Sequence, residues 1–246
     1  MDLSKLNKEQ KIAVEHKKGP LLVLSGAGTG KTRVLTSRFV YIVKNLNVNH
    51  NKIIAVTFTN KAANEIKERV NTELQSNVET PWIGTFHSIF AKFLRKHSGL
   101  VNLKSNFTIL DIEDQKKLLK QVLEYCKIDK DISEVIYHNE IQNLKDNKIL
   151  FSENKKISKF SSIERLDEIY SHYQQRLIEI NAVDFGDILL HSYNILTTNL
   201  DIKETYQNFI EHILIDEFQD TNLIQYDLIK LILNLNKNLF CVGDDD

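Results

Sequence analysis

A short apolar run passes directly into a glycine-rich turn in the segment Leu21-Leu22-Val23-Leu24-Ser25-Gly26-Ala27-Gly28-Thr29-Gly30-Lys31-Thr32. Apolar side chains then recur at helical spacing from Arg33 to Val43. A strand, a glycine-rich loop and a helix in this order are the context that a phosphate-binding loop requires. The sequence therefore predicts an α/β domain that binds a nucleoside triphosphate at this turn.

The residues of the turn indicate how a triphosphate would be held. Its glycines let successive backbone N–H groups point at phosphate oxygens, and the start of the following helix adds positive partial charge. Lys31 would reach the β- and γ-phosphates, and the Thr32 hydroxyl would hold Mg²⁺. Ser25 stands where the usual pattern has glycine, and a small residue can still make the turn. The alternative is an ordinary glycine loop between a strand and a helix.

Composition limits the classes of protein to which the chain can belong. Its 246 residues suggest one or two domains, and its hydrophobic and charged contents of 42% and 26% are ordinary for a soluble globular protein. The net charge of -1 means that any nucleic-acid binding must use a local surface. Cys126 and Cys241 form no CxxC motif and fit a reduced, cytoplasmic compartment. Residues 1–18 are not a signal peptide, and no apolar run approaches the ~18 residues of a membrane helix, so we expect no membrane partner.

Apolar runs typical of a parallel sheet occur on both sides of a region that lacks them. Strands are predicted at 21–24, 53–59, 82–86, 212–217 and 238–244, and helices at 3–16, 33–43, 61–74, 87–96, 187–196, 204–209 and 222–233. Between residues 100 and 181, helices are predicted at 113–126, with Asp111 as N-cap, and at 161–180. This pattern predicts a helical insertion into an α/β core.

A strand that ends in two carboxylates is predicted by Ile213-Leu214-Ile215-Asp216-Glu217. Hydrolysis of ATP needs one carboxylate to hold Mg²⁺ and a second group to orient the attacking water. We expect Asp216 to be the metal ligand, together with Thr32, and Glu217 to act as the general base. The alternative is a solvated acidic strand end, which is common for an isolated Asp-Glu pair.

The residues around this pair resemble motif II of the UvrD/Rep/PcrA family of superfamily 1 DNA helicases, in the string Asp216-Glu217-Phe218-Gln219-Asp220-Thr221-Asn222. Other segments are similar to further motifs in the family's order: the Q motif at 6–14, motif I at 25–32, motif Ia at 57–63, motif Ib at 84–88 and the opening of motif III at 243–246. Asp184-Phe185-Gly186-Asp187 is similar to another family segment, in which the third position is usually a different residue. The resemblance extends over the whole chain.

The resemblance implies roles for individual residues at the ATP site. Gln10 would read the adenine edge, because its amide donates and accepts at once, and Arg33 would lie beside the adenine ring. Lys31 and Glu217 would be catalytic. The full set of ATP-binding residues that the family pattern implies is Gln10, Ser25, Gly26, Ala27, Gly28, Thr29, Gly30, Lys31, Thr32 and Arg33.

Motifs Ia and Ib face single-stranded DNA in the family. The resemblance implies DNA contacts from Phe58, Thr59, Asn60, Lys61, Phe86 and His87. Aromatic rings would stack on bases, and the polar side chains would bind the backbone. The alternatives are that Phe58 and Phe86 are core residues at strand ends and that His87 is structural, as we expect for His172, His191 and His212. A lysine-rich segment could contact duplex DNA through Lys155, Lys156 and Lys159, or could be a solvated face.

The family fold implies a RecA-like P-loop NTPase domain, a parallel sheet flanked by helices, with an all-α insertion subdomain. We expect the RecA-like domain at 1–90 and 181–246, with the insertion at 91–180 and the last residue within motif III. A second RecA-like domain, with its arginine fingers, would be missing. We therefore expect this chain alone to bind ATP weakly and to hydrolyse it negligibly.

The function implied is that of the N-terminal ATP-binding part of an ATP-dependent 3′–5′ DNA helicase. Such an enzyme couples ATP hydrolysis, with Mg²⁺, to translocation on single-stranded DNA and to unwinding of duplex DNA in repair or replication. Two alternatives stay open: the motor part of a helicase–nuclease, and a non-catalytic, truncated remnant that binds ATP or DNA.

Overall fold

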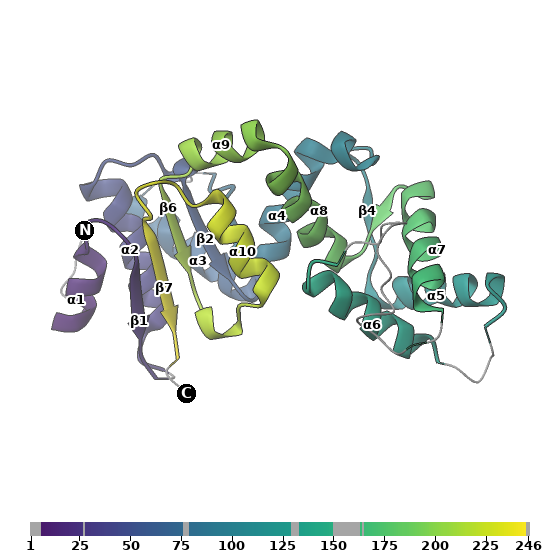
Figure 1. Cartoon of the computed structure of the whole chain (residues 1–246). Helices are drawn as coiled ribbons and strands as arrows, with labels where there is room; N and C mark the ends of the chain where they lie inside the picture. Colours follow the sequence, from purple (N-terminus) through teal and green to yellow (C-terminus); the bar gives the residue numbers. More distant parts are fainter. Residues whose placement is uncertain are drawn as a thin grey trace. The chain divides into compact units, whose positions relative to one another are not determined.

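The computed structural model describes residues 6–26, 28–75, 79–128, 133–149, 163 and 165–244 (Figure 1). The chain divides into two compact units, of which the first comprises Met1–Ile89 and Leu196–Asp246 and the second comprises Phe90–Ile195. The first unit is thus built from two segments that are distant in sequence.

A five-stranded parallel sheet with the order β1-β7-β6-β2-β3 forms the centre of the first unit. Its strands are β1 (Leu21–Leu24), β2 (Ile53–Thr57), β3 (Ile83–Thr85), β6 (His212–Ile215) and β7 (Leu239–Gly243). Every residue of β2 and β6 is buried, as expected for inner parallel strands covered on both faces. Alternate residues of β1 are exposed, because β1 is an edge strand of this sheet. The predicted parallel sheet flanked by helices is confirmed.

The helices of the first unit are α1 (Lys8–Glu15), α2 (Lys31–Asn45), α3 (Asn60–Leu74), the start of α4 (Phe86–His97), the end of α8 (Phe185–Thr198), α9 (Leu200–Phe209) and α10 (Leu223–Ile232). In Figure 1, α2 and α3 lie behind the sheet and α10 lies in front of it. The core under α2 includes Leu35, Phe39 and Ile42, all fully buried. Burial of one such side chain contributes about 1.5–3 kcal/mol, so this face fixes α2 firmly on the sheet.

Two helices of the first unit begin with a capping box. Gln10 N–H donates to Asn7 Oδ1 at 2.8 Å, and Asn7 N–H donates to Gln10 Oε1 at 3.0 Å. Asn222 and Gln225 form the same arrangement at the start of α10. Such caps satisfy backbone donors that the first helical turn leaves free. Of the two residues that could cap the first helix, Ser4 lies outside the described residues and Asn7 is the N-cap observed.

The second unit contains α5 (Ile112–Tyr125), α6 (Glu134–Asp146), α7 (Leu166–Glu179) and most of α4 and α8. It also contains a two-stranded parallel sheet of β4 (Thr108–Ile109) and β5 (Ala182–Val183). The expectation of an all-α insertion was therefore wrong. Each of these strands has only two residues, which is too short for an alternating pattern to be visible in the sequence.

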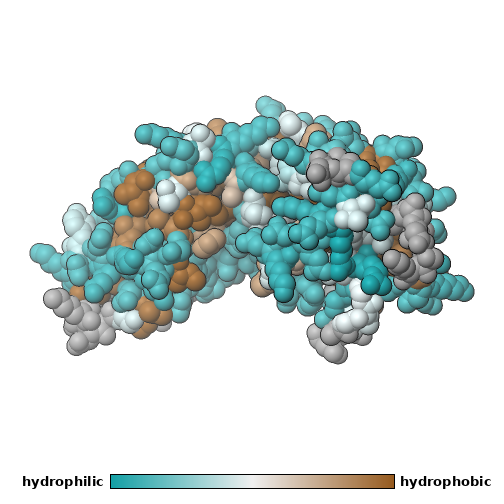
Figure 2. Space-filling view, turned by 180° about the vertical axis from the view of Figure 1, so that it is seen from behind, coloured by the Kyte–Doolittle hydropathy of each residue, from teal (hydrophilic) through white to brown (hydrophobic). Residues whose placement is uncertain are grey.

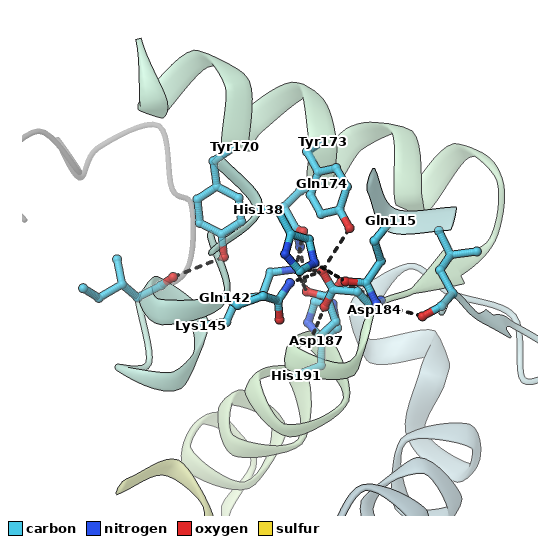
Figure 3. Close-up of polar contacts among 12 residues, drawn as sticks. Gln115, His138, Gln142, Lys145, Tyr170, Tyr173, Gln174, Asp184, Asp187 and His191 are labelled. Carbon is cyan, nitrogen blue, oxygen red and sulfur yellow. Dashed lines mark hydrogen bonds and ion pairs between the residues drawn. The ribbon is translucent and has the colours of Figure 1, made fainter. Parts of the chain in front are cut away.

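A buried polar network joins α6, α7 and the start of α8 within this unit (Figure 3). Lys145 Nζ lies 2.6 Å from Asp184 Oδ2 and 2.8 Å from Asp187 Oδ1, and none of these three side chains is more than 1% exposed. Tyr173 and Gln142 also donate to Asp184, and Gln174 bridges Lys145 and Asp187. The network satisfies every charged group in it, as burial of a charge requires.

This network and the β4–β5 pair explain a difference in domain limits. The second segment of the first unit begins at Leu196, whereas the sequence suggested residue 181. Residues 182–183 pair with β4, and Asp184 and Asp187 bind α6, so this stretch packs with the second unit. The interpretation of the first unit as one interrupted RecA-like domain stays a prediction.

Among the described residues, no helix is both long enough and apolar enough to cross a membrane. The face drawn in Figure 2 is largely hydrophilic, and most of its hydrophobic surface lies in the left half of the view.

Candidate nucleotide-binding site

Three segments meet at the carboxyl edge of the sheet in the first unit. In the β1–β7 register Leu24 lies opposite Gly243, and Ser25 N–H donates to the Gly243 carbonyl at 3.1 Å. Asp216 follows directly after β6, the next strand along. The carboxyl ends of parallel strands are where open α/β sheets place their ligands. The predicted loop, the Asp216-Glu217 pair and Asp244 are therefore brought together.

The glycine-rich loop adopts a conformation that its glycines make possible. Gly28 and Gly30 have φ values of 75° and 91°, in the left-handed region that disfavours other residues. Thr29 Oγ1 donates to the Gly26 carbonyl at 2.7 Å and closes the turn. Gly30 precedes α2 without a side-chain cap, so the first backbone N–H groups of α2 are available to an anion. Ala27 lies outside the described residues.

Lys31 lies at the centre of the site. Its ammonium donates to the Ser25 carbonyl at 3.3 Å and to a carboxylate oxygen of Asp244, and it lies 3.9 Å from Glu217 Oε2. The hydrogen bond to Asp244 raises the pKa of Lys31, with Glu217 contributing in the same direction. The lysine is therefore held in its charged form, which is the form that binds phosphate.

Thr32 and Asp216 form the pair expected for a metal ion. The Thr32 hydroxyl donates to Asp216 Oδ2 at 3.2 Å, and Asp216 is only 4% exposed. Its other carboxylate oxygen, Oδ1, is buried and has no hydrogen-bond partner among the described residues. Burial, followed by the charge of Glu217, raises the pKa of Asp216. A buried carboxylate oxygen without a donor is costly unless a cation binds it, so these residues fit Mg²⁺.

Glu217 is held by a residue that the sequence analysis did not single out. The backbone of Glu217 is in the left-handed region, with φ of 53°. Gln219 Nε2 donates to Glu217 Oε2 at 2.7 Å, and Gln219 Oε1 accepts from Asp244 N–H at 3.0 Å. A Cβ at Gly243 would come within 2.8 Å of that same Gln219 oxygen. Gln219 thus links the acid of motif II to the end of β7, and its place within the motif II string was the available signal.

Gln10 reaches the loop from α1. Its Nε2 donates to the Thr29 carbonyl at 3.0 Å, which ties α1 to the loop. A pocket of about 250 Å³ lies beside it, lined in part by Asn7, Gln10, Val23, Ser25, Thr29 and Lys31. Arg33 is exposed in the first turn of α2. The implied adenine-side residues therefore lie next to the implied phosphate-side residues.

The residues expected to bind DNA separate into two groups. Phe58 is 61% exposed at the carboxyl end of β2, followed by Thr59, which caps α3, and by the exposed Asn60 and Lys61. Phe86 is only 6% exposed, so its ring packs in the interior and offers no surface for a base. This corrects the expectation for Phe86, because residue 86 starts α4 on its buried side. His87 is half-buried, and burial lowers its pKa.

Three lysines proposed for duplex contact, Lys155, Lys156 and Lys159, lie outside the described residues.

A parallel sheet with a glycine loop, a following Lys-Thr pair and a strand-end Asp-Glu pair is the arrangement typical of P-loop nucleotide-binding domains. The chain belongs to the UvrD/REP helicase N-terminal domain family, whose sequence pattern matches residues 6–246.

Named relatives agree with this family membership. The chain is 39% identical over 245 residues to the ATP-dependent DNA helicase PcrA of Staphylococcus aureus. The aligned region covers 99% of this chain and 34% of that protein. It is 44% identical over 245 residues to a probable DNA helicase II homolog of Rickettsia felis, covering 98% of this chain and 37% of that protein. The chain thus spans about a third of the length of these relatives.

Proposed function

We propose that this chain is the N-terminal ATP-binding part of an ATP-dependent DNA helicase that moves 3′ to 5′ along single-stranded DNA. One observation carries the ATP site: a buried Asp216 oxygen that has no hydrogen-bond donor among the described residues, next to the Thr32 hydroxyl and Lys31. The direction of movement and the role in repair or replication rest on the family resemblance alone.

ATP binding would use groups that are already close together. The triphosphate would accept hydrogen bonds from the N–H groups of the loop and of the first turn of α2. Lys31 would exchange its contact with Asp244 for the β- and γ-phosphates. Thr32 and Asp216 would hold Mg²⁺, which neutralises charge on the phosphate oxygens. Gln10 would contact the adenine edge from α1.

Hydrolysis would use Glu217 as the general base. The oxygen of a water molecule bonds to the γ-phosphorus as the bond from that phosphorus to the leaving ADP oxygen breaks, and the water proton passes to Glu217. Gln219 positions this carboxylate through the 2.7 Å hydrogen bond. Lys31 Nζ lies 3.9 Å from Glu217 Oε2, so the proposed base adjoins the lysine that would bind the γ-phosphate.

Single-stranded DNA would pass the carboxyl end of β2. Phe58 offers an exposed ring for base stacking, and Asn60 and Lys61 begin α3, where a phosphate is favoured by the helix N-terminus and by positive charge. In the family the arginine fingers come from a second RecA-like domain, and this chain spans about a third of the length of its relatives. An arginine finger contributes roughly 10³–10⁵ in rate, so we expect this chain to hydrolyse ATP very slowly by itself.

Equilibrium binding of a fluorescent ATP analogue to the purified chain tests the ATP site. We expect Lys31→Ala to weaken binding at least about tenfold, in line with the loss of a charge-assisted contact of roughly 1.5–3 kcal/mol. Asp216→Asn should abolish the increase in affinity that Mg²⁺ gives. Lys18→Ala, at an exposed lysine of the same unit, is the matched control and should bind like the wild type. Equal binding by the Lys31 and Lys18 variants would refute the site.

A further inference from the structure

Three side chains with metal-binding atoms converge in the second unit, among residues that the ATP site does not use. Cys126 contributes a thiol, Glu168 a carboxylate and His172 an imidazole. One candidate ligand atom from each lies within 4.8 Å of those of the other two. Small side-chain rotations bring atoms at such separations to a common ion, because zinc–ligand bonds are about 2.0–2.3 Å long.

Packed helices hold the three residues in place. Glu168 and His172 are four residues apart on α7, a spacing that puts both side chains on one face of the helix. Cys126 follows the last residue of α5 as its C-cap, and its N–H donates to the Val122 carbonyl at 2.9 Å. The two helices lie against each other through a shared buried cluster (Figure 1). A site built on helices in this way is more exact in geometry than one on loops.

A pocket gives solvent access to one side of the cluster. It has a volume of about 400 Å³ and is lined by Gln121, Val122, Tyr125, His172, Gln175 and Arg176, among others. The Tyr125 ring stands edge-on to the His172 imidazole, with ring centroids 5.1 Å apart and planes at 75°. Tyr125 is thus an aromatic neighbour of the imidazole. Cys126 is buried, at 6% exposure.

The kinds of ligand atom select the ion. A thiolate, an imidazole and a carboxylate together suit Zn²⁺, whereas Mg²⁺ prefers oxygen ligands and would not compete. Three protein ligands leave a fourth tetrahedral position, which a water molecule can fill.

The existing partner of Glu168 is compatible with a bound ion. Arg165 donates to both oxygens of Glu168 at 2.8 Å. A carboxylate has about four lone-pair sites, so one oxygen can bind a metal ion while the other keeps Arg165. Arg165 would then orient the ligand from the outer shell, as metal-bound carboxylates commonly require.

We propose that the second unit binds one Zn²⁺ through Cys126 Sγ, a carboxylate oxygen of Glu168 and a ring nitrogen of His172. The zinc–sulfur bond forms as the thiol proton passes to solvent, and a water molecule completes the four ligands. The ion joins the end of α5 to the first half of α7. This site is independent of the proposed ATP site.

Cobalt titration of the metal-free, nucleotide-free 246-residue chain tests the proposal, because Co²⁺ bound to a thiolate gives a sulfur-to-cobalt absorption band. We expect this band to saturate at one equivalent and to disappear when Zn²⁺ is added. Cys126→Ser should abolish the band, and Cys241→Ser, at the other buried cysteine, should keep it. Cobalt at Asp216 would be bound by oxygen alone and would not contribute to the band.

Two variants that keep the thiol guard against an effect of misfolding. His172→Gln and Glu168→Gln should each weaken Co²⁺ and Zn²⁺ binding at least about tenfold, since loss of an outer-shell partner alone costs 10–100-fold. Circular dichroism checks that each variant is folded. The proposal fails if the wild type gives no sulfur band, if the band survives Cys126→Ser, or if folded His172→Gln and Glu168→Gln bind with unchanged affinity.

Discussion

The phenyl ring of Phe58 projects from the end of β2 with 61% of its surface exposed, whereas that of Phe86, after β3, is 6% exposed. We predict that Phe58→Ala weakens binding of the chain to a labelled single-stranded oligonucleotide by roughly 5- to 150-fold, because stacking on one base contributes about 1–3 kcal/mol. Fluorescence anisotropy measures this affinity. The thermal stability of the variant should match that of the wild type.

Two further phenylalanines provide the comparison. Phe86→Ala should lower the free energy of unfolding by about 3–5 kcal/mol, because it leaves a cavity in the core. Phe209→Ala removes a ring that is 39% exposed on α9 and should leave DNA binding unchanged. If Phe58→Ala and Phe209→Ala lose affinity equally, Phe58 has no specific role in DNA binding.

Single residues of the proposed ATP site differ in how far the sequence predicts their positions. Lys31, Thr32 and Asp216 could be predicted, because each occupies a fixed place in a short motif and the structure brings them together. The link from Gln219 to Asp244 could not, since it depends on the left-handed backbone at residue 217 and on where β7 ends. Phe58 and Phe86 could not be distinguished either, because both follow a strand and only packing decides which one is covered.

At the level of elements, the ends of the strands that follow long apolar runs were predicted to within about two residues. Strands β2, β6 and β7 follow nearly continuous β-branched or apolar sequence, as buried parallel strands do. The predicted extension of β2 to residue 59 was wrong, because the Thr59 hydroxyl caps α3 instead. Helix α6 was not predicted, since its three buried apolar residues, Tyr137, Ile141 and Leu144, stand among polar ones. The helix expected from residue 161 begins at Leu166.

Strand β6 begins with a buried histidine whose titration should affect stability. Burial, with the nearby charge of Arg38, lowers the pKa of His212 from 6.5 to about 4 in the folded protein. Between these two values the unfolded chain binds a proton that the folded chain does not. Stability should therefore fall as the pH falls from about 6.5 to 4, by at most about 3 kcal/mol from this residue.

Denaturant unfolding of the wild type and of His212→Gln across this pH range measures that contribution. As the pH falls, the free energy of unfolding of the wild type should decrease relative to that of the variant, because glutamine takes up no proton. A difference between wild type and His212→Gln that does not change with pH would contradict the assignment.

At the scale of the whole molecule, the described residues include a hydrophobic cluster in each of the two units. One lies around the five-stranded sheet and the other among α5, α6 and α7. The loss of β-branched runs after residue 100 predicted a division into two parts. The predicted start of the second segment of the first unit, residue 181, differs from the observed Leu196, because the sequence alone does not show that β5 pairs with β4. A net charge of -1 over the chain also fits DNA contact through a local surface such as the end of β2.

Separate cores imply that damage to the second unit should spare ATP binding. Lys145→Met removes the cation between Asp184 and Asp187 and leaves two buried carboxylates unpaired, so we predict a loss of about 3–5 kcal/mol in the unfolding free energy of this unit. Lys120→Met, at an exposed lysine of α5, should change stability by less than about 0.5 kcal/mol. Under conditions where the Lys145 variant stays folded, its affinity for an ATP analogue should remain within about twofold of the wild type, because the residues of the proposed ATP site lie in the first unit. Denaturant titration and analogue binding on the same samples measure both quantities. A parallel loss of ATP affinity would show that the buried network also supports the nucleotide site.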